Sequence, residues 1–243
     1  MHIYIITGTS SGIGLELTNQ LLKLGNTVYG IARRENGIEH ENYHHVLLDL
    51  ADTSKLEDIL EKIVNETVEK ATSFTLINNA GTIEPIGMAG ELNSDLVAKS
   101  IAVNLTAPMI LTNAFIKMLA EKAIPKKVIQ ISSGAGRNAY EGWSSYCAGK
   151  AGLDRFTESV NLEELNKENG VRLISIAPGI IDTNMQGTIR QSKESAFPLV
   201  DRFKDYKTTG KLSSPADVAS KLIQLIESDQ FYQIDVLSDL RNL

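Results

Sequence analysis

The chain has 243 residues, 42% of them hydrophobic and 22% charged, so it is long enough to bury one large core in a single domain. Its 24 basic and 30 acidic residues give a net charge of -6, which argues against nucleic acid as a partner. The single cysteine excludes an intrachain disulfide and favours a cytoplasmic protein. We expect no secretory signal in MHIYIITG and no membrane partner, because apolar runs such as Leu173 to Ala177 are too short to cross a bilayer.

Short β-rich runs alternate with longer amphipathic runs along the chain. We expect strands at 2–7, 27–32, 45–50, 74–80, 126–133, 171–177 and 232–237. We expect helices at 12–24, 53–71, 94–119, 145–167 and 215–227. This alternation predicts a single α/β domain over residues 1–243, with a doubly wound parallel sheet of about seven strands and helices on both faces.

One long interruption, around 179–212, separates the sixth strand from the last helix. It is too long for an ordinary connector, and loops of that length beside a site often act as lids. We therefore interpret it as a substrate loop. The alternative is a surface excursion without function.

The segment TGTSSGIG follows the first strand directly and leads into an apolar helix. Glycines there allow a sharp turn, close approach of the backbone to a pyrophosphate and close packing of helix on sheet, while the helix N-terminus favours negative charge. We predict dinucleotide contacts at Gly8, Ser10, Ser11, Gly12, Ile13 and Gly14. Ser11 stands where a basic residue would give an additional anchor for the phosphate.

The second strand ends in Arg33 and Arg34, where an NAD site usually places a carboxylate on the ribose 2'-hydroxyl. Two guanidinium groups suit a 2'-phosphate instead. The pair therefore favours NADP(H) over NAD(H) as the cofactor. A solvated basic pair at a strand end is the alternative interpretation.

Polar and small residues also follow the third and fourth strands. Asp49 could accept a hydrogen bond from the adenine amino group, and Asn79, Ala80 and Gly81 end a strand beside the same crevice. Ligands bind at the carboxyl ends of the strands in such sheets, so these four residues are candidate cofactor contacts. Each could equally form a turn or a helix cap.

Tyr146 and Lys150 are four residues apart on an expected helix, so their side chains share one face. A free tyrosine, with a pKa of about 10, is about 0.1% ionised at neutral pH. A nearby ammonium group and an oxidised nicotinamide would stabilise the phenolate and bring that pKa closer to the working pH. Taken alone, however, such a pair is usually a solvated helix face.

Ser133, at the end of the fifth strand, and Asn104 complete a larger pattern. TGTSSGIG, NNAG, Asn104, Ser133, YCAGK and PGIIDT stand in the order and spacing typical of one enzyme family. Over essentially its whole length the chain resembles the short-chain dehydrogenase/reductase family. The resemblance implies a Rossmann fold and an NADP(H)-dependent oxidoreductase acting on CH-OH and C=O groups.

The resemblance also implies roles for the catalytic residues. Tyr146 would be the acid-base residue, and Ser133 would hold the substrate oxygen. Lys150 would bind the nicotinamide ribose and lower the tyrosine pKa, and Asn104 would support a water-linked proton path. Together with Asn104, Tyr146 and Lys150, the expected contacts around the nicotinamide are Pro178, Gly179, Ile181 and Thr183.

A finer likeness concerns the substrate. The segments SSGAGRNAYEGWSSYCAGKAG and APGIIDTNMQ look like those of sepiapterin reductases and of bacterial relatives that reduce benzil to a benzoin. Trp143 and Met185 would line a pocket for a flat conjugated carbonyl compound, together with Ser133 and Tyr146. Trp143 could equally pack against the lid. Asp235 takes a position similar to the aspartate that anchors the pterin in sepiapterin reductases, although a strand-end aspartate is more often a turn residue.

The favoured hypothesis is an NADPH-dependent reductase of aromatic or vicinal dicarbonyl compounds, of the benzil to benzoin type. Sepiapterin reduction is the alternative within the same chemistry. A non-catalytic dinucleotide-binding regulator and an NAD-dependent alcohol or sugar dehydrogenase are alternatives outside it. The helices at 94–119 and 145–167 carry apolar faces that family members use to form homodimers or homotetramers, or that simply pack on the sheet.

Overall fold

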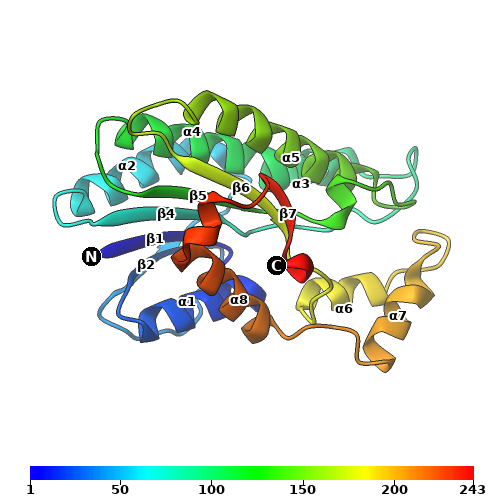
Figure 1. The fold of residues 1–243 in the computed structure, drawn as a ribbon. Coiled ribbons are helices and arrows are strands. Elements are labelled where there is room, and N and C mark those ends of the chain that lie inside the picture. The colour runs from blue at the N-terminus through cyan, green and yellow to red at the C-terminus, as the bar shows by residue number, and fades with distance from the viewer.

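A computed structural model describes residues 1–243 and contains a seven-stranded sheet, all of it parallel, with strand order β3-β2-β1-β4-β5-β6-β7 (Figure 1). The predicted α/β Rossmann fold is therefore confirmed. The strands are β1 (His2–Thr7), β2 (Thr27–Ala32), β3 (Tyr43–Leu47), β4 (Ser73–Asn78), β5 (Lys126–Ile131), β6 (Arg172–Ala177) and β7 (Leu237–Asp239). The central strands are buried on both faces, which explains why they are almost continuously apolar in sequence.

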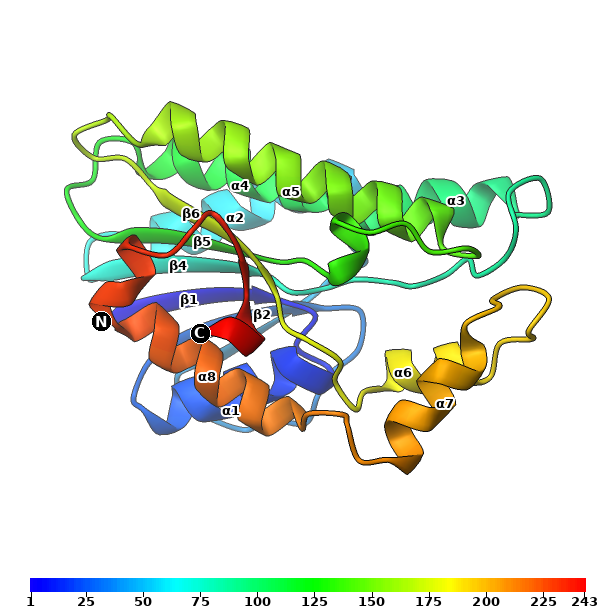
Figure 2. The ribbon, with the colours of Figure 1, turned by 45° about the vertical axis from the view of Figure 1, so that its right-hand side comes forward.

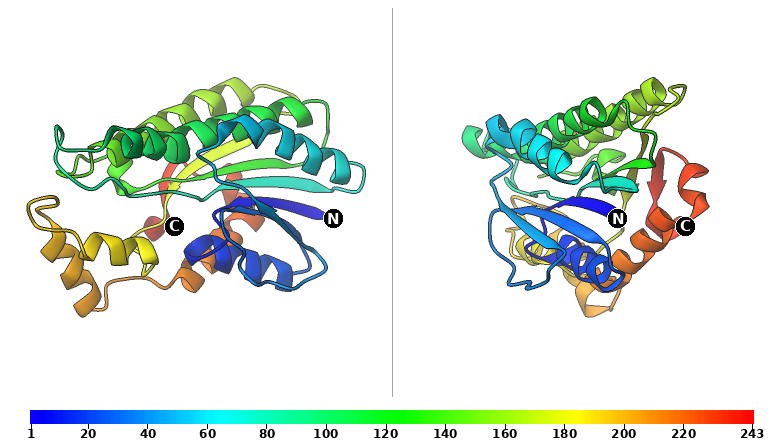
Figure 3. Two further views of the ribbon diagram at one scale, coloured as in Figure 1. Left: turned by 180° about the vertical axis from the view of Figure 1, so that it is seen from behind. Right: turned by 90° about the vertical axis from the view of Figure 1, so that its left-hand side faces the viewer.

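Two helical layers cover the sheet (Figure 1, Figure 3). One layer holds α2 (Leu56–Thr67), α3 (Ser94–Ile101), α4 (Ala107–Leu119) and α5 (Ser144–Glu164). The opposite layer holds α1 (Gly12–Lys23) and α8 (Pro215–Glu227). Each layer buries its own apolar core against the sheet, around Phe74 and Phe115 on the first face and around Leu17 and Phe231 on the second.

The helix α3 runs into α4 through one π-helical turn, Ala102–Thr106. The combined helix Ser94–Leu119 is long and apolar enough to cross a membrane by length and composition. Leu111, Phe115 and Leu119 are nevertheless completely buried against the sheet, as in a core helix of a globular domain. The expectation of short apolar runs concerned uninterrupted runs only, and polar residues such as Lys99 and Asn104 interrupt this helix.

The bounds of the third and seventh strands differ from those expected from the sequence. β3 pairs with β2 from Tyr43 onward, so it begins and ends before the expected 45–50. At the C-terminus, Asp229–Tyr232 forms a 3-10 turn that buries Phe231 in the core. The expected strand at 232–237 therefore gives way to the short β7, which pairs with β6.

The segment 179–212 is largely helical. It contains α6 (Asn184–Arg190) and α7 (Val200–Thr208), which lie beyond the carboxyl ends of the strands and outside the layer of α1 and α8 (Figure 2). Their buried residues include Ile189, Val200 and Phe203, which pack with Trp143 and Tyr146 in a third, smaller apolar cluster. The segment therefore packs against the helix that carries Tyr146.

Candidate active site

A cavity of about 730 Å³ opens at the carboxyl ends of the strands. We call its one side the glycine half, lined by Gly8, Ser10, Ser11, Gly12, Ile13, Arg33, Arg34, Asp49, Asn79, Ala80 and Gly81. The other side is the aromatic half, lined by Ile83, Tyr140, Trp143, Met185, Ile189, Phe203 and Tyr206. Ser133, Tyr146, Lys150, Pro178, Gly179, Ile181 and Thr183 line the same cavity. Nearly all predicted site residues are thus brought together.

The glycine half is built on the turn between β1 and α1. Gly8 and Gly12 have φ angles of 78° and 60°, which residues with a Cβ rarely adopt. Gly14 does not line the cavity, because it lies behind the turn, where a Cβ would collide with the carbonyl oxygen of Gly8. Since α1 begins at Gly12, its first N–H groups face the cavity and favour an anion there.

The segment after β4 holds this turn in place. The backbone N–H groups of Asn79 and Ala80 both donate to Thr7 Oγ1, at 3.0 Å, and Asn79 Nδ2 donates to the Thr7 carbonyl at 2.8 Å. The amide of Asn79 therefore fixes the turn, while Ala80 and Gly81 present backbone to the cavity. The shape of the glycine half is therefore set by the carboxyl ends of β1 and β4.

A group of charges lies at the outer end of the glycine half. The Asp49 carboxylate lies 3.9 Å from the Arg33 guanidinium and 3.4 Å from Lys99 Nζ, and Arg33 and Asp49 are both partly exposed. Burial alone would raise the pKa of Asp49, but the Ala51 N–H and the Lys99 and Arg33 cations hold it below its usual value. Asp49 is therefore a carboxylate at neutral pH, and Arg33, Arg34 and Lys99 outnumber it in positive charge.

Tyr146 and Lys150 lie on α5 at the junction of the two halves, and they are only 6% and 4% exposed. Lys150 Nζ donates to the Ile131 carbonyl at 2.7 Å and lies 5.9 Å from the centre of the Tyr146 ring. Burial raises the pKa of Tyr146 to about 12, although the neighbouring Ser133 hydroxyl acts in the opposite direction. Burial lowers the pKa of Lys150 to about 8, partly offset by Asp154.

Ser133 caps the 3-10 turn Gly134–Gly136, because its Oγ accepts from the Ala135 N–H at 3.2 Å. This turn packs directly on α5: a Cβ on Gly136 would lie 3.0 Å from the carbonyl oxygen of Lys150. The Ser133 side chain is thereby held beside Tyr146, on a separate strand end.

Asn104 is completely buried and does not line the cavity. It lies in the π-helical turn, a feature frequent at functional sites, and exchanges hydrogen bonds with the backbone of Thr82 at 3.0 and 2.8 Å. A Cβ on Gly81 would lie 3.1 Å from Asn104 Oδ1 and 3.7 Å from Lys150 Nζ. Asn104 and Lys150 therefore both lie against Gly81.

The aromatic half is closed by the 179–212 segment. The Trp143 ring is 4% exposed and stacks on Phe197, with ring centres 4.5 Å apart and planes at 6°. The same ring meets Tyr146 and Phe203 edge to face. Gly142, with a φ of 81°, lies so close to this segment that a Cβ would collide with the Ala196 carbonyl.

Of the predicted substrate contacts Met185 and Asp235, only one lines the cavity. Met185 lines the cavity, whereas Asp235 is exposed, precedes β7 and does not reach the cavity. The expectation for Asp235 was wrong because the last strand starts two residues beyond it. The C-terminal side chain that does line the cavity is Arg241.

Several lining residues that are distant along the chain were not predicted from the sequence, namely Ile83, Lys99, Tyr140, Arg202, Phe203, Tyr206 and Arg241. Apart from Tyr140, which lies in the segment SSGAGRNAYEGWSSYCAGKAG, none of them stands in a motif. The only local signal was the aromatic spacing of Phe203 and Tyr206 on an amphipathic run, which helix α7 also needs for packing.

Comparison with known proteins places these features in context. Residues 2–194 match the short chain dehydrogenase family. The chain is 42% identical to a benzil reductase ((S)-benzoin forming) of Bacillus cereus, over 98% of each chain, and 31% identical to the sepiapterin reductase of Rattus norvegicus, over 94% of this chain and 92% of the relative. A solved structure of 4-hydroxyisoleucine dehydrogenase complexed with NADH matches with a TM-score of 0.83 at 27% identity, over 98% of this chain and 96% of the other.

Proposed function

We propose that the chain is an NADPH-dependent carbonyl reductase of the benzil to benzoin type. It belongs to the short-chain dehydrogenase family, and it is therefore an oxidoreductase acting on CH-OH and C=O groups. The observation that carries the proposal is the burial of Tyr146 and Lys150 at the junction between a dinucleotide-shaped glycine half and an aromatic half. A proton donor and a flat apolar binding surface thus meet at one point.

The glycine half fits a nicotinamide dinucleotide, because positive-φ glycines and the α1 N-terminus leave backbone N–H groups facing the cavity. When bound, this cofactor supplies the hydride that reduces a carbonyl carbon. Arg33 and Arg34 support the 2'-phosphate of NADP(H) over the free hydroxyl of NAD(H). Pro178, Gly179, Ile181 and Thr183 would flank the nicotinamide end.

The chain's own residues handle the proton. At neutral pH Tyr146 is a neutral phenol, since burial places its pKa at about 12, so it holds the proton that a developing alkoxide needs. The Ser133 hydroxyl donates a hydrogen bond to the same oxygen and orients the carbonyl. The Lys150 cation stabilises the phenolate that remains, and Asn104, which lies with Lys150 against Gly81, would support the path by which the proton is restored.

The shape of the aromatic half supports aromatic or vicinal dicarbonyl substrates. Tyr140, Trp143, Phe203 and Tyr206 line this half, so a conjugated ketone bound there would contact aromatic side chains. The likeness to a benzil reductase at 42% identity favours benzil over sepiapterin, and Asp235, which would have anchored a pterin, lies outside the cavity. The 179–212 segment acts as the lid that covers this substrate.

We further propose a cytoplasmic homodimer or homotetramer. Met109 on α4 and Leu162 on α5 are large apolar side chains exposed on the outer surface of the helical layer. Their exposure on adjoining helices would be relieved by pairing with a second copy. Light scattering of the purified protein tests the oligomeric state, and a monomer at micromolar concentration would contradict it.

The experiment that tests the function measures oxidation of NADPH and, separately, of NADH by the purified protein, with benzil, sepiapterin and a simple aldehyde as substrates. NADPH-dependent reduction that favours benzil supports the proposal. Equal or better reduction of sepiapterin would assign the chain to pterin chemistry instead. Cofactor binding without oxidation by any carbonyl would favour a non-catalytic regulator.

A further inference from the structure

Two arginines line the outer wall of the aromatic half, where a neutral diketone needs no charge. Arg202 comes from α7 and Arg241 from the C-terminal turn Leu240–Asn242, so they reach the cavity from separate parts of the chain. The chain as a whole has a net charge of -6, so this local excess of positive charge stands against the overall balance. Glu84 is the single acidic side chain lining the aromatic half, and it is exposed.

Arg241 is fixed in position. Its Nε donates to Asp239 Oδ1 at 2.9 Å, and its Nη2 donates to Asp239 Oδ2 at 2.5 Å. Its aliphatic stem packs on the turn after β6, since a Cβ on Gly179 would lie 3.3 Å from Arg241 Cγ and Cδ. Asp239 thus occupies one edge of the guanidinium and leaves Nη1 without a partner in the protein. The result is an oriented donor beside the Pro178–Gly179 turn.

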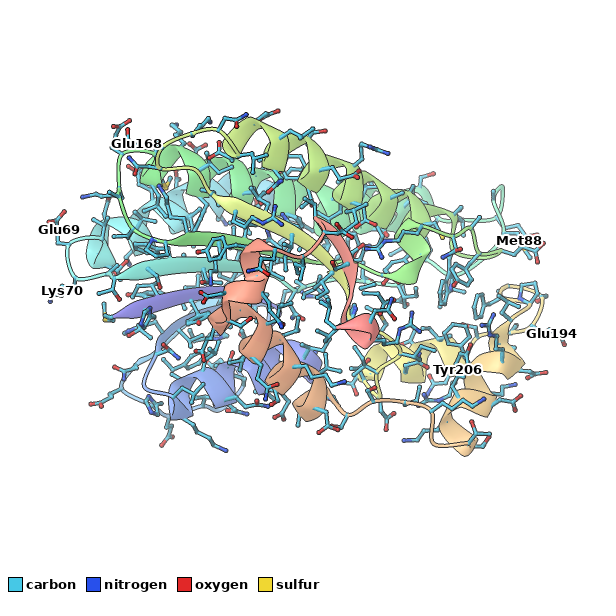
Figure 4. All side chains as sticks on the ribbon, in the orientation of Figure 1. Glu69, Lys70, Met88, Glu168, Glu194 and Tyr206 are labelled. Atoms are coloured by element: carbon cyan, nitrogen blue, oxygen red, sulfur yellow. The ribbon has the colours of Figure 1, made fainter.

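Arg202 is the less neutralised of the two. Its Nε donates to Tyr206 Oη at 2.5 Å, and the guanidinium carbon lies 5.5 Å from the centre of the Tyr206 ring. Figure 4 labels Tyr206 on α7, in the segment that covers the aromatic half. Asp201, the neighbouring acid in sequence, pairs with Lys204 at 2.7 Å. Arg202 therefore keeps its remaining N–H groups and its charge for a ligand.

The two arginines share their surroundings. The hydrogen bond to Asp239 is the main cause that raises the pKa of Arg241, and Tyr140 and Tyr206, which line the cavity, act in the same direction. The N–H groups of the two guanidinium groups that Asp239 and Tyr206 leave free are hydrogen-bond donors at this wall. Donors of this kind match an acceptor with negative charge and do not match the amino-substituted edge of a pterin.

We propose that the preferred substrate is an aromatic keto acid whose carboxylate binds to Arg202 and Arg241 while its ketone is held at Ser133 and Tyr146. This inference rests on the proposed carbonyl reductase function and narrows its substrate class. The aromatic ring would lie in the aromatic half, and the reacting carbonyl would stand between this ring and the carboxylate. Recognition by two guanidinium groups gives charge-assisted hydrogen bonds that a neutral ester cannot form.

The kinetic test compares benzoylformate, benzoylpropionate and benzoylbutyrate with their methyl esters, which share the ketone and differ in charge. At least one acid is expected to exceed its ester about tenfold in kcat/KM, the lower end of what a charged hydrogen bond gives at a partly exposed site. Arg202→Met and Arg241→Met are each expected to raise KM for that acid, and together to abolish its advantage over the ester in kcat/KM.

Lys221→Met is the matched control, because it removes an exposed positive charge from α8 outside the cavity. It is expected to leave the ratio of acid to ester unchanged. The inference is overturned if the acids have no higher kcat/KM than their esters in the wild type, or if the higher kcat/KM of the acid survives in the double variant. In either case, reduction of the esters and of benzil would still establish the carbonyl reductase. Failure to reduce any carbonyl overturns the proposed function itself.

A binding measurement separates the anion site from turnover. Trp143 is the single tryptophan of the chain and forms a wall of the aromatic half, so its fluorescence reports on a ligand there. Titration of the complex with NADP⁺ is expected to show binding of phenylacetate and about tenfold weaker binding of the neutral phenylacetamide. Equal affinity for phenylacetate and phenylacetamide would contradict the anion site. An equal loss of affinity for the two ligands in the double arginine variant would contradict it as well.

Discussion

The glycine half of the cavity is built on the ends of neighbouring strands, whereas the aromatic half is built from side chains of distant segments. Gly8 follows β1 directly, Asn79 and Ala80 follow β4, and hydrogen bonds from Asn79 and Ala80 to Thr7 join these two strand ends. Trp143, Phe203 and Arg241 instead come from three segments far apart in sequence and meet only by packing. The lesson is that the cofactor end is determined by the sheet, while the substrate end can change without disturbing it.

The largest effect is expected from removing the Tyr146 hydroxyl, which lies at the junction of the glycine half and the aromatic half. Tyr146→Phe keeps the buried ring and deletes the phenolic proton, so turnover is expected to fall by about a thousandfold. Binding of NADPH, measured by fluorescence titration, should stay near the wild-type value. Tyr140→Phe, which removes a neighbouring hydroxyl in the aromatic half, is the control and should cost less than about tenfold. Near-normal turnover of the Tyr146 variant would remove the assigned proton donor.

Gly142→Ala should damage the aromatic half alone. The new Cβ would meet the Ala196 carbonyl at a positive φ, so the segment that carries Phe197 must move away from Trp143. We expect kcat/KM for carbonyl substrates to fall about 10 to 100-fold, from overpacking and backbone strain together. The affinity for NADPH should be unchanged. Gly210→Ala, also at a positive φ but with open space around it, controls for strain and should leave kcat/KM almost intact.

Lys150→Met tests how much the buried cation at the junction lowers the free energy of unfolding. Burial lowers the pKa of Lys150 to about 8, below its unfolded value of about 10.4, so the folded chain binds fewer protons than the unfolded chain between these pH values. The penalty for the buried cation is therefore fully present below about pH 8 and disappears as the pH rises toward the unfolded value.

Lys150→Met should consequently raise the free energy of unfolding by about 1 to 3 kcal/mol at neutral pH, with loss of activity. The gain should shrink above about pH 8, and denaturant titrations across the pH range measure it. The exposed Lys62→Met on α2 should shift stability by less than about 0.5 kcal/mol at every pH. A destabilised Lys150 variant at neutral pH would mean that the hydrogen bond to Ile131 outweighs burial.

Arg33→Ala should give the smallest change, confined to the glycine half. Loss of a partly exposed guanidinium is expected to weaken NADPH binding about tenfold and NADH binding by much less. Reduction of benzil at saturating NADPH should be nearly unaffected. Arg155→Ala, which removes an arginine exposed on α5, serves as the control. Equal losses for both cofactors would argue against recognition of the 2'-phosphate by Arg33.

Much of the fold could be predicted because each central strand is a continuous apolar run. β1 and β2 have the expected bounds, and the helices α1, α2, α4, α5 and α8 lie where amphipathic spacing placed them. The predictions for β3 and β7 failed at the sheet edges, where pairing and not composition sets the bounds. The helices of the 179–212 segment were missed because they are short and bury only a few residues each.

The candidate site divides in the same way. Gly8 could be inferred from its place after the first strand, and the shared face of Tyr146 and Lys150 from helical spacing, whereas their joint site with Ser133 followed from the family resemblance. Asp235 was assigned wrongly, since one turn buried around Phe231 changes which C-terminal side chain reaches the cavity.

By itself, the sequence determined the strand and helix alternation, the glycine-rich turn and the pairing of Tyr146 with Lys150, because these depend on backbone periodicity over a few residues. Only the tertiary structure decided the aromatic half, the burial that moves the two pKa values apart, and the placement of Arg202 and Arg241. Those properties depend on side chains that are distant along the chain and become neighbours only when the 179–212 segment and the C-terminus pack over the ends of the strands.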